Sequence, residues 1–538
     1  MQPAIFGQVN ELLQFVLLLP LLPLLSLLYL RRQDPKKQPR AHGLKVYPLV
    51  GTVPHFVKNQ RRFLDWSTDV LKRDPSHTLS FKALGLTGGA ITANPDNVEH
   101  ILKTNFANYP KGELTVSMIE DFLGHGIFNS DGEQWLWQRK AASYEFSKRS
   151  LRNFVVDAVR FDVVERLLPL LDRARRDGRT VDVQDVLERF ALDNICRVAF
   201  GEDPACLAED GMAKPESAEF MRAFNDAQSA TMARFMSPVK SLWRLKRFLN
   251  MELERRMREA VGTVHGYADR IIRERRARGE AAGLAACGRD DFLSRFAASG
   301  EHSDESLLDV VTNFLLAGRD TTSSALTWFF WLVSTRPDVE EKIVREVRAV
   351  RPSSTPRQES ASAAAFSFDE LRDMQYLHAA ITESMRLYPP VAMDAHSCKE
   401  DNFLPDGTLV GKGWLTTCRN QTPRRAWIVN AGDGAVIAAR TRADGNTHNK
   451  HTREKVDFRR CQQRSPFGLL LTLLYTNACY NLGLATTKPP PRHAAQSAPH
   501  RFAAARAACT EHVMARTDRI GPGHVVIKHA IDHALPLT

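Results

Sequence analysis

Ala317-Gly318-Arg319-Asp320-Thr321-Thr322-Ser323-Ser324 interrupts a stretch, Leu307 to Val333, that is otherwise apolar almost all the way round. A helix that is apolar on every side is typical of the interior of a large protein, where glycine costs about 1 kcal/mol relative to alanine and buried polar groups need partners. One interpretation is a groove with a proton-relay face, suited to binding and protonating a diatomic ligand. The other is that the hydroxyl groups bond to helix carbonyls and bend the helix. The residues alone favour neither.

Two further segments carry polar residues at helical spacing. Glu383-Ser384-Met385-Arg386 is followed directly by Leu387-Tyr388-Pro389-Pro390, and it lies about sixty residues after the first motif. Glu and Arg three residues apart commonly form a solvated pair, and Glu252 and Arg255 have the same spacing. The third segment, Trp135-Leu136-Trp137-Gln138-Arg139-Lys140, would by itself be the exposed basic start of a helix.

Together, the three segments resemble the cytochrome P450 monooxygenases. The first resembles the oxygen-binding helix motif of that family, the second its E-x-x-R helix with the turn that follows, and the third its W-x-x-x-R helix. In the third segment the resemblance implies an arginine and a tryptophan against the haem propionates, a charge-assisted contact that suits these residue types. The implied roles are Asp320 and Thr321 as catalytic proton donors, Ala317 and Gly318 as the space for dioxygen, Thr322 as a further cofactor contact, Trp135 and Arg139 as haem contacts, and Glu383 and Arg386 as a structural pair.

Other segments resemble a plant group within the superfamily, which contains fatty-acid omega-hydroxylases and oxidases of the jasmonoyl-isoleucine hormone conjugate. They are NVEHILKTNFANYPKGE (97–113), FLGHGIFNSDGEQW (122–135) and RKAASYEFSKRSLRNFV (139–155). The resemblance implies a haem cofactor, a small lipophilic substrate of fatty-acid origin, and electrons from NADPH through NADPH–cytochrome P450 reductase. It also implies a mainly α fold with a small β part, in an incomplete P450-like domain over residues 57–414.

Apolar periodicity predicts the elements around these motifs. We expect a first helix within 60–73, and short strands at Thr78–Phe81 and Ala90–Ala93. Asn94-Pro95 predicts a helix start, with the asparagine as N-cap and the proline at the first helical position. Recurrence at threes and fours predicts further core helices within 155–171 and 186–195.

The N-terminal end predicts a membrane anchor. Residues 12–30 contain only Gln14 and Ser26 as polar residues, and about 20 apolar residues span a bilayer as a helix. Basic residues follow this run and none precedes it, which favours a retained anchor with the main domain in the cytosol. We expect a single-pass anchor at 1–32 in the endoplasmic reticulum membrane, in contact with lipid, and a basic, proline-rich neck at 33–56. A buried core helix or a cleaved peptide is the alternative.

The haem-thiolate pattern is missing from the sequence. The family holds its iron with a cysteine thiolate, whose electron donation helps cleave the O–O bond, in an F-x-x-G-x-R-x-C-x-G setting. Cys461 has Arg459 two residues before it, but Asp457 and Glu454 stand where Gly and Phe belong. We therefore name no metal ligand, and the arginine that would complete the Glu383–Arg386 pair is missing with the same region. The other cysteines after Glu383 match no better: Cys398, Cys418, Cys479 and Cys509.

Composition changes at the same place. The 538 residues are 43% hydrophobic and 25% charged, which is typical of a globular enzyme. Residues 415–538 hold 18 basic and 7 acidic residues, whereas residues 1–414 hold 55 of each, so the net charge of +11 belongs to the final 124 residues. We interpret this basic tail as frame-shifted or mis-spliced sequence. The alternative to an active enzyme is then a catalytically dead remnant or a gene-model artefact. A tail that binds nucleic acid or a metal is disfavoured, because its histidines are not paired as ligands.

Overall fold

The computed structural model describes residues 44–47, 50–82, 88–145, 156–207, 215–237, 239–282, 304–350, 368–419 and 526–527, with the single residues 293 and 366. The described chain is mainly helical with a small β part, as the sequence predicts. It divides into two compact units. Unit 1 comprises Met1–Thr115, Met232–Met251 and Met393–Arg419, and unit 2 comprises Val116–Thr231, Glu252–Ala392 and Asn420–Thr538.

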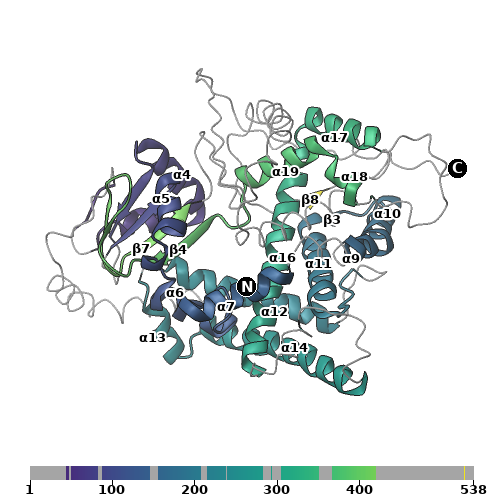
Figure 1. Cartoon of the computed structure of the whole chain (residues 1–538), viewed down its shortest axis with the longest axis horizontal. Coiled ribbons are helices and arrows are strands. Elements are labelled where there is room, and N and C mark those ends of the chain that lie inside the picture. Colours follow the sequence, from purple (N-terminus) through teal and green to yellow (C-terminus); the bar gives the residue numbers. More distant parts are fainter. Residues whose placement is uncertain are drawn as a thin grey trace, which may run out of the picture. The chain divides into compact units, whose positions relative to one another are not determined.

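Unit 1 is built on a four-stranded sheet of order β1-β2-β7-β4, with α4 and α5 beside it (Figure 1). Strand β2 pairs antiparallel with β1 and parallel with β7, and β7 pairs antiparallel with β4. The predicted start of α5 is confirmed, because the Asn94 side chain accepts a hydrogen bond from the amide of Asp96. The elements of this unit are α3 (Val53–Lys58), α4 (Phe63–Arg73), β1 (Thr78–Phe81), β2 (Gly89–Thr92), α5 (Pro95–Glu99), α13 (Leu242–Phe248), β4 (Met393–Ser397), β5 (Asn402–Phe403), β6 (Leu409–Val410) and β7 (Leu415–Arg419).

Strand β7 continues the sheet past Trp414, where the sequence predicts the start of the tail. Its last residue, Arg419, is almost fully buried and donates hydrogen bonds to the carbonyl of Leu64 (2.8 Å) and the hydroxyl of Thr68 (2.9 Å). Because both partners lie on α4, the strand is tied to the first predicted helix as well as to its neighbouring strands. The ordered fold therefore extends five residues into the predicted tail.

Unit 2 is organised around α16, which packs against α11, α14, α17 and α19. Figure 1 shows α11 running alongside α16. Apolar residues of α16 face both main core clusters of the unit, and the predicted helix over 307–333 is confirmed. Its elements are α6 (Gly112–Leu123) and α12 (Pro215–Met236), which belong mostly to it, and α7 (Gly132–Glu145), α9 (Val156–Asp162), η6 (Val163–Leu167), α10 (Leu168–Arg176), β3 (Val181–Asp182), α11 (Val183–Ile195), η7 (Cys196–Phe200), α14 (Glu252–Ala282), α16 (Asp304–Ser334), α17 (Pro337–Val350), α18 (Phe368–Arg372), α19 (Gln375–Leu387) and β8 (Val526–Ile527).

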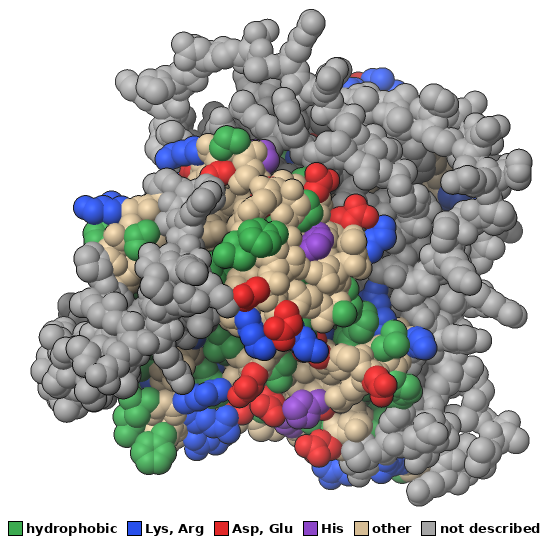
Figure 2. Space-filling model, turned by 60° about the vertical axis from the view of Figure 1, so that its left-hand side comes forward, with side chains coloured by type: hydrophobic (Ala, Val, Ile, Leu, Met, Phe, Trp, Pro, Cys, Tyr) green, Lys and Arg blue, Asp and Glu red, His purple; other side chains and the backbone are tan. Residues whose placement is uncertain are grey.

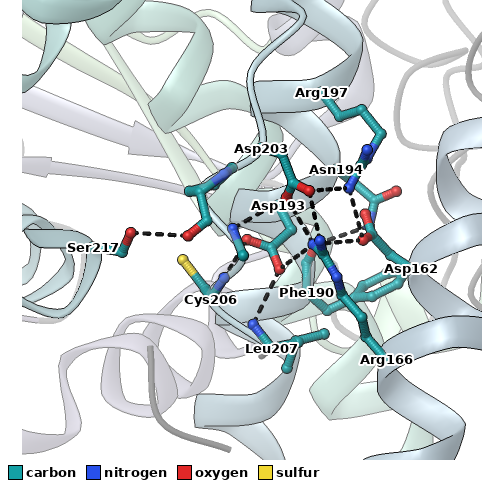
Figure 3. A network of polar contacts seen from close by, with 12 residues as sticks. Asp162, Arg166, Phe190, Asp193, Asn194, Arg197, Asp203, Cys206, Leu207 and Ser217 are labelled. Atoms are coloured by element: carbon teal, nitrogen blue, oxygen red, sulfur yellow. Dashed lines mark hydrogen bonds and ion pairs between the residues drawn. The ribbon is translucent and has the colours of Figure 1, made fainter. Parts of the chain in front are cut away.

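A charged cluster holds several elements of unit 2 together. We call it the Asp193 cluster, formed by Asp162, Arg166, Asp193, Arg197 and Asp203 (Figure 3). Asp162 and Asp193 have fully buried side chains, and the two arginines are mostly buried. The cluster joins the end of α9, η6, α11 and η7 to the segment that follows, so charges add to the apolar contacts that these elements make in the two main core clusters.

Several predicted regions lie outside the described residues. These are the anchor at 1–32, the neck up to residue 43, and residues 420–525 and 528–538 of the tail. In the parts of the chain that are described, no helix is both long enough and apolar enough to cross a membrane. From the tail, β8 pairs antiparallel with β3. On the face drawn in Figure 2, acidic and basic side chains of the described residues are interspersed.

Candidate functional site

The motif of α16 divides between a buried side of the helix and a half-exposed side. Ala317, Thr321 and Ser324 are spaced by four and three residues and are all half-exposed. Gly318 and Thr322 are buried between them. Residues three and four apart lie on one side of a helix, so the first three form a continuous stripe, beside other partly exposed positions of α16 such as Leu316, Asp320 and Thr327. We call these three residues the α16 stripe.

The hydroxyl groups of the motif bond to helix carbonyls. Thr321 donates its hydroxyl to the carbonyl of Ala317 at 2.6 Å, one turn earlier. Ser323 donates to the carbonyl of Asp320 at 3.3 Å. The back-bonding that the sequence offered as one alternative is therefore present, and it fixes the Thr321 hydroxyl on the side of Ala317. This placement leaves the oxygen atom of Thr321 able to accept hydrogen bonds, because a hydroxyl can donate one and accept two.

Gly318 lies against α11. A Cβ atom at this position would come within 2.5 Å of the side chain of Ile195, closer than two carbon atoms can approach without displacement. Thr322, four residues on, is buried on the same side of the helix. The structure thus brings Ala317, Asp320 and Thr321 together near the stripe, whereas Gly318 and Thr322 face the helix packing.

Arg319 and Asp320 form the charged centre of the motif. Arg319 is fully buried, and its guanidinium donates to Asp320 Oδ1 at 3.0 Å and to Glu188 Oε2 of α11 at 2.9 Å. It also donates to Asn225 Oδ1 of α12 at 2.7 Å, while Gln228 of the same helix donates to Asp320 Oδ2. Burial raises the pKa of Asp320 to about 6, and the charge of Arg319 and the Gln228 hydrogen bond act against this rise. We call these five residues the Arg319 cluster.

The sequence did not identify Arg319 or its partners as site residues. Glu188 and Asn225 lie 131 and 94 residues from Arg319, and Gln228 lies 92 residues from Asp320. No local spacing connects positions so far apart. The available signal was Arg319 itself, a charged residue in the middle of a helix whose neighbours are apolar, because such a charge is paired when it is buried.

The loop before α7 is fixed to α16 by side chains from one face of that helix. Asp309 accepts a hydrogen bond from the amide of His125 at 2.8 Å, and Asn313 accepts one from the amide of Phe128 at 3.1 Å. Asn313 also donates to the carbonyl of Leu123 at 2.9 Å. Asp309 and Asn313 continue the four-residue spacing that leads to Ala317, so the helix that follows this loop is placed relative to the α16 stripe.

Trp135 and Arg139 lie one turn apart on α7, and both are half-buried. Burial lowers the pKa of Arg139, since a buried guanidinium loses hydration. Arg139 has no ion pair or hydrogen bond with another residue that the structure describes. A carboxylate would supply the missing partner, so this pair fits the predicted contact with haem propionates.

Glu383 and Arg386 form a buried, bidentate ion pair on α19. Arg386 donates from Nε to Glu383 Oε2 at 2.7 Å and from Nη2 to Oε1 at 2.6 Å. Among the described residues no third charged group joins the pair. The turn after it is held to α16 by the Tyr388 ring, which stacks on Trp328 with 3.9 Å between centroids and 5° between planes. The pair therefore has a structural position beside the helix that carries the motif.

None of the four described cysteines, Cys196, Cys206, Cys398 and Cys418, stands in the F-x-x-G-x-R-x-C-x-G setting in which the family holds its haem thiolate. All four are buried, and burial raises the pKa of each thiol, to about 11 for Cys398 and about 12 for Cys418. For Cys196 and Cys206 the direction is the same. Cys461, tested as the axial ligand from its sequence setting, lies outside the described residues together with Cys287, Cys479 and Cys509.

Comparison with known proteins identifies relatives over most of the described chain. A family model described as Cytochrome P450 matches residues 42–417. The chain is 45% identical over 383 residues to Cytochrome P450 CYP94D108 of Paris polyphylla, covering 71% of this chain and 72% of that protein. It is 46% identical over 367 residues to Cytochrome P450 94B1 of Arabidopsis thaliana (68% and 69% covered). With Cytochrome P450 94A1 of Vicia sativa it shares 40% over 373 residues (69% of each).

Proposed function

This chain belongs to the cytochrome P450 family, and from this premise we propose that its domain hydroxylates a fatty acid or a fatty-acid-derived hormone conjugate, in the manner of an omega-hydroxylase. The proposal depends on one observation above the others, the α16 stripe, which places the partly exposed Ala317 and Thr321 one turn apart and next to Asp320. Its relatives in the plant 94 group support the choice of substrate class. When bound, haem supplies the oxidative chemistry, and the protein supplies binding, orientation and protons.

The residues of the site have separate roles in binding and proton transfer. Ala317, whose side chain is a single methyl group, leaves space on the stripe for a small ligand. Thr321 Oγ1, fixed by its bond to the Ala317 carbonyl, accepts and passes on a proton, and Asp320 supplies it. A carboxyl group with a pKa of about 6 exchanges protons readily near neutral pH. Trp135 and Arg139 of α7 seat the propionates.

The remaining partners follow from the family and from the sequence. Electrons come from NADPH through NADPH–cytochrome P450 reductase, and the substrate is small and lipophilic. The predicted anchor at 1–32 places the chain in the endoplasmic reticulum membrane with its main domain in the cytosol. The anchor is tested by extracting membranes with alkaline carbonate, which releases a chain that lacks a spanning helix and leaves an anchored one in the pellet.

A second candidate is a non-catalytic remnant that lacks thiolate-ligated haem. It is favoured by the sequence, because no cysteine after Glu383 stands in the F-x-x-G-x-R-x-C setting of the haem ligand. The charge boundary near Leu415 also favours it, since a frame-shifted tail would replace the segment that carries the ligand. Reading the other two frames of the coding DNA past Trp414 tests this origin. A cysteine in an F-x-x-G-x-R-x-C setting in one of them supports it, and its absence from both contradicts it.

The reduced carbon monoxide difference spectrum of the purified full chain separates the two candidates. A thiolate-ligated haem gives a red-shifted Soret band, and the remnant gives none. A chain that shows the band is then tested for turnover with a medium-chain fatty acid, NADPH and the reductase. A Thr321→Ala variant is expected to lose most of the product per NADPH consumed, whereas Thr327→Ala, which removes a hydroxyl bonded to Ser323 two turns further on, retains it. A spectrum without the band overturns the proposed hydroxylase for this chain.

A further inference from the structure

A fully buried charge lies next to the proposed proton donor. Arg319 has no exposed surface, although arginine is almost never fully buried unless it is paired. The two terminal nitrogen atoms of its guanidinium have different hydrogen-bond partners. Nη1 donates to Asp320, and Nη2 donates to both Glu188 and Asn225. The Phe224 ring covers the group, with 5.2 Å from Cζ to the ring centroid.

The two carboxylates compete for one positive charge. Asp320 and Glu188 both contact Arg319, so one negative charge in the cluster is not balanced. The groups that face Asp320 from α12 are the neutral amides of Gln228 and Asn225. Of the charged groups in the described chain, Arg319 of its own helix and Glu188 of α11 act on Asp320, and none from α14, α17 or α19 does. A proton shared by this cluster therefore resides on one of two acids.

Two observations favour Asp320 as the acid that takes the proton. Asp320 has a raised pKa, because burial disfavours its charged form more than Arg319 restores it. Asp320 is also the acid that adjoins the α16 stripe, and its Oδ2 is held by an amide rather than by the guanidinium. The arginine thus fixes Oδ1 from the buried side, whereas Oδ2 contacts only the neutral Gln228 amide among the described residues and is the oxygen atom where a proton meets less electrostatic opposition.

We propose that Arg319 is a positioning residue for Asp320, which it orients toward the stripe while Arg319 and Glu188 jointly set the proton occupancy of that carboxyl group. This inference rests on the proposed function in one respect only, that the proton held by Asp320 is used in the hydroxylation. The chain would tune its proton donor through the fully buried arginine that precedes it in the motif and through an acid on a neighbouring helix. Removing the positive charge and removing the competing acid then shift the titration of Asp320 in opposite directions.

Infrared spectroscopy of the full chain tests this, because a protonated carboxyl group has a carbonyl stretch distinct from that of a carboxylate. The Asp320 signal is isolated by subtracting the spectrum of an Asp320→Asn partner for the chain and for each variant, over a range of pH. An Arg319→Met variant is expected to raise the titration midpoint by about one pH unit or more. Arg319→Lys, which keeps the charge, keeps the midpoint close to that of the unaltered chain, and Glu188→Gln lowers it.

Arg166→Met is the matched control, since it removes a mostly buried arginine from the Asp193 cluster and is expected to leave the Asp320 midpoint unchanged. Equal midpoints for Arg319→Met, Arg166→Met and the unaltered chain overturn the proposal. If Arg319→Met does not fold, Glu188→Gln decides alone, and an unchanged or raised midpoint overturns it. The titration needs neither haem nor substrate, so a negative carbon monoxide spectrum would overturn the proposed function without affecting this result.

Discussion

The Arg319 cluster and the Asp193 cluster share α11 and have the same charge balance, but they hold their acids differently. The Arg319 cluster has one arginine and two carboxylates, and the Asp193 cluster has two arginines and three carboxylates. Each has one acid in excess. Burial raises the pKa of Asp320 to about 6, and in the Asp193 cluster it raises the pKa of both Asp162, to about 7, and Asp193.

The bonding partners distinguish them. Both oxygens of Asp193 accept backbone hydrogen bonds, from the amides of Cys206 (2.8 Å) and Leu207 (3.1 Å), so this acid fixes the chain path (Figure 3). Asp320 is held only by side chains, those of Arg319 and Gln228. Charge balance alone therefore does not separate a structural cluster from a chemical one. An acid that satisfies backbone amides has little freedom to exchange its proton, whereas one held by side chains can do so.

The largest expected effect is on Asp193. An Asp193→Ala variant should lose about 3–5 kcal/mol of unfolding free energy, because two buried amides and a buried arginine lose their acceptor. The control is Asp172→Ala, which removes a more exposed acid paired with Arg175 at 3.0 Å and should lose less than about 1 kcal/mol. Urea unfolding measures both. Equal losses would break the comparison, since Asp193 would then have no special structural role.

The pH dependence of Asp162 gives the next effect. Its pKa is raised from 3.8 to about 7, chiefly by burial and then by Asp193, so between these pH values the folded chain binds a proton that the unfolded chain does not. This stabilisation is present at low pH and is lost as pH rises toward 7, by about 2–3 kcal/mol between pH 5 and 8. Asp162→Asn removes the titrating group. Its stability relative to the unaltered chain should therefore increase by that amount over the same interval in urea unfolding. A constant difference across the interval would show that Asp162 does not hold the excess proton.

Much of this arrangement could be predicted from local sequence, and the clusters could not. The helix at 307–333, the Asn94 cap and the ion pair of Glu383 and Arg386 depend on residues within four positions of each other, where spacing and side-chain type suffice. The Arg319 cluster depends on contacts across 92 to 131 residues, which only the packing of α11, α12 and α16 creates. Likewise, the four-residue period of the motif predicts on which side of the helix Gly318 lies. It does not predict which neighbouring side chain Gly318 contacts.

The contact between α11 and α16 at Gly318 gives a smaller effect. Gly318→Ala should destabilise the chain by about 1–2 kcal/mol, because the new Cβ meets the buried, branched Ile195 side chain at 2.5 Å. In α14, an added Cβ at Gly262 meets nothing within 4 Å, so Gly262→Ala should instead stabilise by about 0.5–1 kcal/mol, as alanine usually does in a helix. Thermal unfolding measures the sign of each. Stabilisation by both variants would mean that α11 and α16 can separate without cost, and the clusters would then be independent.

The smallest effect is expected for an exposed arginine–acid pair whose N–O distance is similar to those in the two clusters. Arg345 and Glu341 on α17 are 2.8 Å apart, and their side chains are 72% and 71% exposed. Arg345→Met should change the unfolding free energy by less than about 0.5 kcal/mol, because water solvates both charges and the long side chains lose entropy when they pair. Added salt should leave the difference between this variant and the unaltered chain almost unchanged in urea unfolding. A loss above 1 kcal/mol would contradict the view that burial, rather than the pairing of an arginine with an acid, gives the two clusters their energetic weight.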